Sequence, residues 1–241
     1  PVEPKKADKN AVREVLDINA GKLGLGEFET RTILDAYAIP NVPGELAADA
    51  PQAAMIAKEI GFPVALKIVA EGVLHKSDAG GILLNLEDEE SVRSGFELLT
   101  NRIRSQYPGA AIAGVMVEKM APKGLEVIIG MRRDPTFGPM MIFGMGGTLV
   151  EQLKDISFRV APLSLEDIQE MIDVTIAGKL LKGVRGSSRA DIEAVQAAIA
   201  ALSQAALDFP ELEEIEINPL VVYPQGQGAL ALDSRAVLRP S

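Results

Sequence analysis

The stretch VALKIVAEGVLHKSDAGGILLNL, residues 64–86, decides the expected fold because two apolar runs enclose a polar, glycine-closed segment. The runs Val64–Val69 and Ile82–Leu86 are short, aliphatic and bounded by turn-forming residues, which predicts two strands. Between them lies His75, the only histidine of the chain, followed directly by Lys76. A lone imidazole in a lysine-bearing, glycine-ended loop suits a phosphate better than a hydrophobic core.

The lone histidine has a functional and a structural interpretation. Much of the imidazole is neutral near pH 7, and the neutral form is the nucleophile that accepts a phosphoryl group. The alternative is a hydrogen-bonded structural histidine, which is the commoner role of an isolated polar residue. The choice depends on the polar residues elsewhere in the chain.

Helical and strand patterns alternate outward from this segment. Apolar residues at helical spacing predict helices, and short runs rich in valine and isoleucine predict strands, which after residue 112 are typical of an antiparallel sheet. The expected helices are Ala11–Asn19, Glu27–Tyr37, Pro51–Ile60, Glu89–Gln106, Ser164–Thr175 and Arg189–Asp208, the last two with serine N-caps at Ser164 and Ser188. The further expected strands are Ile112–Glu118, Glu126–Met131, Met140–Phe143, Ile156–Val160, Ile215–Val222 and Ala229–Asp233.

These elements predict an α+β fold with two subdomains. We expect an N-terminal linker and helix at residues 1–21, a first subdomain at 22–117 and a second at 118–241. The chain begins at Pro1 with a segment rich in proline and lysine, which reads as the end of an extended linker in a longer polypeptide.

The composition narrows the class of protein. Of 241 residues, 47% are apolar, enough to bury a sizeable core. No apolar run reaches the roughly 18 residues that span a bilayer and no export leader opens the chain, so we expect a cytoplasmic protein with no membrane partner. The 24 basic and 34 acidic residues give a net charge of −10, which disfavours nucleic acid as a partner. Without cysteine and with one histidine, a metal would be a hard cation on oxygen ligands, such as Mg²⁺.

Charged residues on the expected strands are candidates for phosphate and nucleotide binding. Lys67 lies inside an apolar strand; it is either a surface lysine or a point charge that binds a phosphate in a cleft. Glu118 and Glu126 flank a loop between two strands. They are either solvated charges or acceptors for hydrogen bonds from adenine or ribose.

Two further groups follow along the chain. Gly144–Gly147 ends a strand and either offers backbone amides to an anion or forms a tight turn. Asn218 and Asp233 lie on strands joined by a turn, and hairpin pairing would bring them side by side as oxygen ligands for Mg²⁺. The segment Gly21–Gly26 is rich in glycine but lacks P-loop spacing and a preceding strand, so we interpret it as a helix-ending loop.

The ordered set of these residues resembles the ATP-grasp domain of nucleoside-diphosphate-forming acyl-CoA synthetases, over about Leu25 to Val237. It looks most like the β subunit, or fused β domain, of ADP-forming acetyl-CoA synthetases, which are relatives of the succinyl-CoA synthetase β subunit. The resemblance rests on Lys67, His75-Lys76-Ser77-Asp78 with Gly80-Gly81, Glu118, Glu126–Gly130, and Glu216–Leu220 with Asp233.

The resemblance implies an ATP-grasp fold, in which two α+β subdomains bind a nucleotide in the cleft between them. His75 would be a phosphohistidine that relays phosphate between ADP and a histidine of an α-type subunit. The reaction implied is acid + CoA + ATP ⇌ acyl-CoA + ADP + phosphate. The residues implied in binding are Lys67, Lys76, Glu118, Lys119, Met120 and Glu126 for the nucleotide, and Asn218 and Asp233 for Mg²⁺.

No CoA-binding Rossmann segment and no second histidine are present, so the resemblance implies an enzyme that needs a CoA-binding α-type partner, separate or fused. The chain would then be part of a hetero-oligomer or of a longer polypeptide. Two alternatives stay open. One is a non-catalytic ATP-sensing or degenerate module of a fused acyl-CoA-linked acyltransferase. The other is a carboxylate–amine ligase, which needs no histidine.

Overall fold

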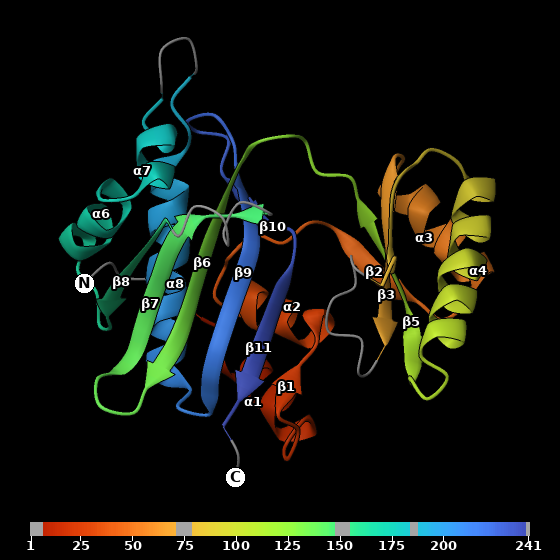
Figure 1. Cartoon of the computed structure of the whole chain (residues 1–241), viewed down its shortest axis with the longest axis horizontal. Coiled ribbons are helices and arrows are strands. Elements are labelled where there is room, and N and C mark those ends of the chain that lie inside the picture. The colour runs from red at the N-terminus through yellow and green to blue at the C-terminus, as the bar shows by residue number, and fades with distance from the viewer. Residues whose placement is uncertain (1–6, 71–78, 148–154, 184–187, 240–241) are drawn as a thin grey trace. The chain divides into compact units, whose positions relative to one another are not determined.

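The computed structural model describes residues 7–70, 79–147, 155–183 and 188–239. Contacts divide the chain into two compact units, each described by itself below (Figure 1). Unit 1 comprises Pro1–Asn41 and Lys123–Ser241, and unit 2 comprises Val42–Pro122.

The helices are α1 (Lys9–Ile18), α2 (Glu27–Ala36), α3 (Ala50–Ile60), α4 (Glu89–Gln106), α6 (Leu165–Asp173), α7 (Ile176–Leu181) and α8 (Ile192–Asp208). The strands are β1 (Gly24–Leu25), β2 (Gly44–Ala47), β3 (Val64–Ala70), β4 (Ile82–Leu86), β5 (Ile112–Lys119), β6 (Leu125–Asp134), β7 (Gly138–Met145), β8 (Ile156–Val160), β9 (Leu212–Val222), β10 (Ala229–Ala231) and β11 (Ser234–Leu238).

Unit 1 is discontinuous in sequence, which differs from the boundaries at residues 21 and 117 expected from sequence. The apolar side of α1 and α2 packs into the same core as the last hundred residues, and β1 pairs with β11 through Gly24 and Val237. The Tyr37 ring packs edge-on against Phe209 at 6.5 Å. Helical periodicity identifies α1 and α2 but does not reveal that the surface they cover is made from the other end of the chain.

Unit 1 is built on an antiparallel sheet in the order β1-β11-β9-β6-β7-β8, with β10 added beside β9. Helix α8 lies behind the central strands, and α6 and α7 lie beside it (Figure 1). Alternate residues of the strands, such as Ile129, Phe143 and Ile217, point into this helical layer and are fully buried. The sheet therefore has one face covered by helices.

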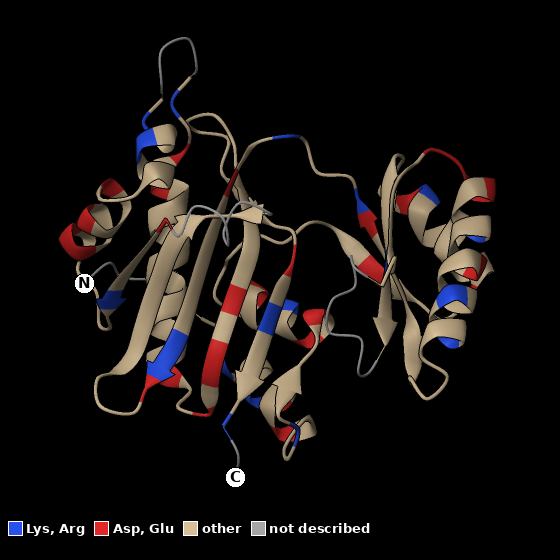
Figure 2. Ribbon diagram, in the orientation of Figure 1, with Lys and Arg blue, Asp and Glu red and all other residues tan. Residues whose placement is uncertain are grey.

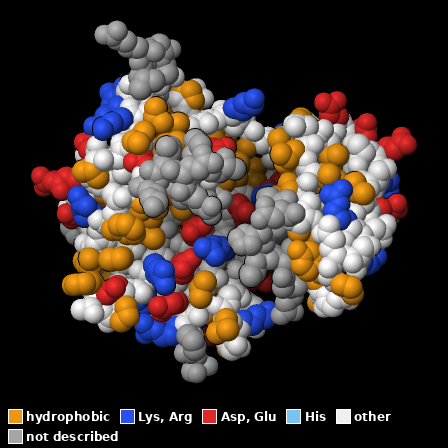
Figure 3. Space-filling model, viewed as in Figure 1, with side chains coloured by type: hydrophobic (Ala, Val, Ile, Leu, Met, Phe, Trp, Pro, Cys, Tyr) orange, Lys and Arg blue, Asp and Glu red, His pale blue; other side chains and the backbone are white. Residues whose placement is uncertain are grey.

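The other face of β7 and β8 carries apolar side chains at the surface. Ile156, Phe158 and Val160 alternate along β8 and are each more than one-third exposed. Hydrophobic side chains gather in this region of unit 1, at the left of the view (Figure 3). Toward β9 and β11 the same face becomes charged, with Arg235 paired to Glu214 and Glu216 (Figure 2).

Unit 2 is a four-stranded antiparallel sheet in the order β2-β5-β3-β4, with α3 and α4 packed on one face. Even-numbered residues of β3, among them Leu66 and Ile68, enter the helical core, so the odd-numbered Lys67 lies on the opposite face. The two strands expected around the His75 loop are thus β3 and β4, and they pair directly with each other.

Capping residues account for several helix starts. Ser164 and Asp167 form a reciprocal capping box at α6, so the expected cap at Ser164 is confirmed. The expected cap at Ser188 is wrong: α8 begins after Asp191, whose side chain accepts a hydrogen bond from the Ala194 amide at 3.2 Å. Asp191 also accepts from the Gly228 amide, so it ties the helix start to the turn before β10.

Four short elements were not expected from sequence: β1, β2, β11 and α7. Each has two to six residues, too few to show a period of their own. Helix α7 instead depends on the distant Asp155 carboxylate, which accepts hydrogen bonds from the amides of Ile176 and Ala177 at 2.7 and 2.8 Å. Among the described helices, none is both long enough and apolar enough to cross a bilayer.

Candidate functional site

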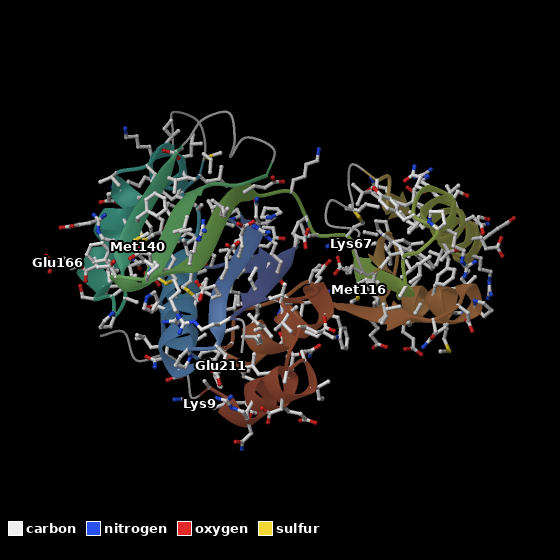
Figure 4. All side chains as sticks on the ribbon, turned by 60° about the horizontal axis from the view of Figure 1, so that its bottom comes forward. Lys9, Lys67, Met116, Met140, Glu166 and Glu211 are labelled. Atoms are coloured by element: carbon white, nitrogen blue, oxygen red, sulfur yellow. The ribbon has the colours of Figure 1, made fainter. Side chains whose placement is uncertain are left out.

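Lys67 and Glu118 form a buried ion pair in unit 2. Lys67 on β3 pairs in register with Met116 on β5 (Figure 4). This register places Glu118 diagonally across from Lys67 on the same face. Nζ of Lys67 lies 2.8 Å from Oε2 of Glu118, and the side chains are 9% and 3% exposed. The interpretation of Lys67 as a solvent-exposed surface lysine is therefore wrong, and Glu118 fixes where its ammonium points.

The residues after Glu118 are held against the turn that precedes β3. Nζ of Lys119 donates to the carbonyl oxygens of Gly61 and Phe62 at 2.6 and 2.9 Å, so this ammonium caps the end of α3. The amide of Met120 donates to the Pro63 carbonyl at 3.1 Å. These contacts fix the backbone of residues 118–120. A nucleotide contact by Lys119 would accordingly come from its main chain.

Asn218 and Asp233 lie next to each other in unit 1, as the expected hairpin pairing requires. The Asn218 amide donates to the Asp233 carbonyl at 3.0 Å, and the neighbouring pair Ile217 and Ser234 continues into the β9–β11 ladder. Asn218 lies on the sheet face opposite α8, since Ile217 points into the core. The structure therefore brings together the two residues expected to bind a cation.

The glycine run after β7 packs against these residues. The amide of Gly146 donates to the Glu126 carbonyl, and the amide of Gly147 donates to Oδ1 of Asn218 at 2.9 Å. A Cβ on Gly147 would overlap Oε2 of Glu126. The two amides therefore serve protein oxygens. Gly146 also passes too close to β6 for a side chain, since its Cβ would lie 2.5 Å from the Val127 carbonyl carbon. Sequence reasoning noticed the glycines but not their neighbours.

The described candidate residues thus form two groups. Lys67, Glu118, Lys119 and Met120 belong to unit 2, and Glu126, Gly147, Asn218 and Asp233 belong to unit 1. His75 and Lys76 lie outside the described residues.

The oxygen ligands of the unit 1 group suit Mg²⁺. In the described part of the chain, no three His, Cys, Asp or Glu side chains come close enough to form a metal cage. One carboxylate from Asp233 and one amide oxygen from Asn218 fit a Mg²⁺ that completes its octahedron with waters and phosphates. The donor set does not resemble a site for a softer metal.

The fold and these residues define a nucleotide-binding class of protein, and comparison with known families agrees. Residues 18–238 match the family described as ATP-grasp domain. The β subunit of ADP-forming acetate–CoA ligase I from Pyrococcus furiosus is 42% identical over 227 residues, 94% of this chain and 97% of that subunit. The ADP-forming acetate–CoA ligase I of Archaeoglobus fulgidus is 40% identical over 237 residues, which are 98% of this chain but 34% of that longer protein.

Solved structures support the same family. Two structures of the dinucleotide-forming acetyl-CoA synthetase 1 from Candidatus Korarchaeum cryptofilum are both 39% identical, with TM-scores of 0.86 and 0.83, and cover 95% of this chain and all of theirs. One has a phosphorylated phosphohistidine segment, and the other holds Mg-AMPPCP with that segment pointing towards the nucleotide site. The chain belongs to the ATP-grasp family, in the branch of the β subunits and β domains of ADP-forming acyl-CoA ligases. The sensing module of an acyltransferase, the alternative raised from sequence, is not supported, because these relatives are ligases.

Proposed function

We propose that this chain is the nucleotide-binding and phosphoryl-transfer component of an ADP-forming acyl-CoA ligase. The observation that carries the proposal is the match to the P. furiosus β subunit over almost the whole of both chains. The overall reaction is acid + CoA + ATP ⇌ acyl-CoA + ADP + phosphate, and this component performs the step that involves ATP.

Phosphoryl transfer depends mainly on positioning and on neutralising charge. We assign Lys67, held by Glu118, to the nucleotide phosphates, because an ammonium on a rigid strand offers a fixed positive charge. Lys76 joins it in this role. Glu118, Lys119 and Met120, together with Glu126, are assigned to the adenosine.

We assign Mg²⁺ to Asn218 and Asp233. Bound there, the ion neutralises charge on the phosphate oxygens during transfer. Asp233 contributes the carboxylate and Asn218 the neutral amide oxygen. The two residues keep their spacing because adjacent backbone positions are hydrogen-bonded.

His75 is assigned as the residue that carries the phosphoryl group. A neutral imidazole nitrogen attacks the γ-phosphorus of ATP, the bond to the bridging oxygen of ADP breaks, and a phosphorus–nitrogen bond forms. The group then moves to the CoA-binding part of the enzyme. His75 is the only imidazole in the chain.

The partner in this proposal is a CoA-binding α-type subunit or fused domain. The fused A. fulgidus ligase, of which this chain matches 34%, illustrates how much of such an enzyme lies outside this component. Because the chain supplies only the nucleotide half, thioester formation from acid, CoA and ATP requires both parts. We also propose a cytoplasmic location, where ATP and CoA are both available.

The phosphohistidine is tested with γ-phosphate-labelled ATP. We expect a protein-bound label that is lost in acid and survives alkali, and we expect His75→Ala to abolish it. Nucleotide affinity should stay within about tenfold, roughly 1.4 kcal/mol, because the loop acts in transfer rather than in ground-state binding. Ser77→Ala, in the same loop, is the matched control and should keep the label. Full ligase activity of His75→Ala with an α-type partner would overturn the relay.

The metal ligands are tested by calorimetry with ADP, with and without Mg²⁺. Asp233→Asn should weaken binding more in the presence of Mg²⁺ than in its absence, because the change removes a charged ligand for a hard cation. Glu14→Gln, an exposed acid on α1, is the control for the lost charge. An equal loss with and without Mg²⁺ would remove Asp233 from the metal site.

A further inference from the structure

We infer that Gly147 is a positioning residue for the Mg²⁺ site, acting through Asn218. This inference rests on the proposed assignment of Asn218 and Asp233 to the metal. Gly147 follows β7 and touches neither the phosphates nor the metal in that assignment. Its contribution is to fix the direction of one ligand oxygen.

The first observation is a hydrogen bond across 71 positions of sequence. The Gly147 amide donates to Oδ1 of Asn218 at 2.9 Å. A side-chain amide rotates freely about its last bond unless a partner holds it, and this donor orients the oxygen rather than the nitrogen toward Gly147. A carbonyl oxygen has two lone pairs, so the same oxygen accepts the amide and binds a cation.

The second observation is that a side chain at this position would be both strained and crowded. Its φ of 68° lies in the left-handed region, and an added Cβ would overlap Oε2 of Glu126. A methyl group would therefore displace either the Glu126 side chain or the Gly147 backbone. Displacement of that backbone withdraws the amide from Asn218.

Metal sites depend strongly on such outer contacts. Groups that orient a ligand without touching the metal typically change metal affinity by about 10–100-fold when they are lost. Asn218 is already fixed through its backbone by the carbonyl of Asp233. The Gly147 amide supplies the missing constraint, because it fixes the side chain.

Gly138 offers a matched control for the test. It is the first residue of β7, the strand that Gly147 follows, and it also has a left-handed φ, 80°, but no heavy atom lies within 4 Å of an added Cβ. Gly138→Ala therefore introduces the same kind of backbone strain as Gly147→Ala without the collision. A difference between the two variants in the effect of Mg²⁺ on ADP binding is therefore due to the contacts around Gly147.

The experiment measures ADP affinity of the full chain with Mg²⁺ and with EDTA, together with melting temperature. In the unaltered chain and in Gly138→Ala, we expect Mg²⁺ to strengthen ADP binding by the same factor. In Gly147→Ala this factor should fall by about tenfold or more. The metal-free affinity reports separately on any displacement of Glu126, which is assigned to the adenosine. The double variant Gly147→Ala with Asn218→Ala should lose no more of the Mg²⁺ factor than Asn218→Ala alone, because both act through one ligand.

Three outcomes overturn the inference. If the two glycine variants keep the same Mg²⁺ factor, Gly147 serves packing alone. If Gly147→Ala loses metal-free and metal-dependent binding equally, with a lowered melting temperature, the loop has simply unfolded. If the losses of Gly147→Ala and Asn218→Ala are additive, Gly147 does not act through Asn218. Absence of ADP binding in the unaltered chain is a separate result, which overturns the nucleotide site itself and this inference with it.

Discussion

Lys67 in unit 2 and Asn218 in unit 1 both lie on interior strands of their sheets, but their side chains are fixed in different ways. Lys67 is held by an opposite charge, the buried carboxylate of Glu118. Asn218 is held by neutral backbone groups, the Gly147 amide at its side chain and the Asp233 carbonyl at its own amide. A buried charge depends on its partner, whereas a backbone hydrogen bond depends on the shape of the chain. We therefore expect the stability of unit 2 to fall when a buried charge is removed. We expect the Asn218 group to be disturbed when a neighbouring side chain is enlarged.

The largest effect is expected when the buried ion pair of unit 2 is broken. Lys67→Met breaks the 2.8 Å ion pair at a site where Glu118 is 3% exposed, and loss of one member of a buried pair should cost about 3–5 kcal/mol of unfolding free energy. Urea unfolding, monitored by a probe in unit 2, measures the loss. Adding Glu118→Leu to the Lys67→Met chain should recover much of it, because both charges of the pair are then gone.

The control for this experiment is an exposed pair in the same unit. Lys58 and Glu89 are 3.0 Å apart, but the lysine side chain is 70% exposed. Lys58→Met should therefore cost no more than about 1 kcal/mol. Equal losses for Lys67→Met and Lys58→Met would show that burial of the ion pair does not determine its contribution to stability.

A smaller effect in unit 2 is expected at Lys119. Lys119→Met removes both hydrogen bonds to the carbonyl oxygens of Gly61 and Phe62, and charged hydrogen bonds of this kind contribute about 1.5–3 kcal/mol. We expect a loss of about 2 kcal/mol in urea unfolding, in that same range. Lys123→Met, an exposed lysine four positions later, is the matched control and should be nearly neutral. If both variants were neutral, the Lys119 ammonium would not anchor the turn before β3.

The smallest effect is expected for a charged contact in unit 1. It tests whether a charge there contributes less to stability than the buried pair of unit 2. Asp208 accepts hydrogen bonds from Lys9, Tyr37 and Gln204 at 2.8, 2.7 and 2.9 Å. Burial opposes its ionisation, but these three donors together outweigh burial and lower the pKa of Asp208 below its usual value. A carboxyl group with a lowered folded-state pKa stabilises the protein above its unfolded-state pKa, and this contribution is lost as pH falls through the folded-state pKa.

Asp208→Asn should therefore flatten the loss of stability below about pH 4, near the unfolded-state pKa of an aspartate. The change at neutral pH should be of the order of 1 kcal/mol, the value of a typical hydrogen-bonded contact. Melting temperatures at neutral and acid pH measure both. Glu14→Gln, an exposed acid on α1, controls for the general loss of negative charge. An unchanged acid slope in Asp208→Asn would show that other carboxyl groups govern the acid response of unit 1.

Local sequence patterns predicted the longer elements and the local part of the site. Helix α4 and strand β4 have the residue bounds expected from periodicity, because each is a continuous run with clear ends. Asn218 and Asp233 were expected side by side on two strands joined by a single turn; they are adjacent, although Asp233 lies between β10 and β11 rather than within a strand. Such contacts depend on neighbours that are close in sequence.

Contacts between distant segments could not be predicted in this way. The Lys67–Glu118 pair depends on the register of β3 against β5, which no local pattern specifies. The contact between Gly147 and Asn218 joins positions even further apart. The run Gly144–Gly147 indicates that another segment of the chain approaches its backbone, but the sequence does not identify that segment. Similarly, Asp191 rather than Ser188 caps α8 because Asp191 also binds the turn before β10.

The division of unit 1 into two chain segments has a consequence for how the protein is made. Unit 2 is complete once residue 122 has left the ribosome, and its sheet then has every described strand it needs. Helices α1 and α2 cannot complete their core at that point, because β9 and β11 follow unit 2 in the chain. Helices α1 and α2 are therefore made before unit 2 but completely buried only after it, and Ile33 and Leu34 lack their core until β9 and β11 have been made. We expect nascent chains to acquire protease resistance in unit 2 first, and in α1 and α2 only after β11 has emerged.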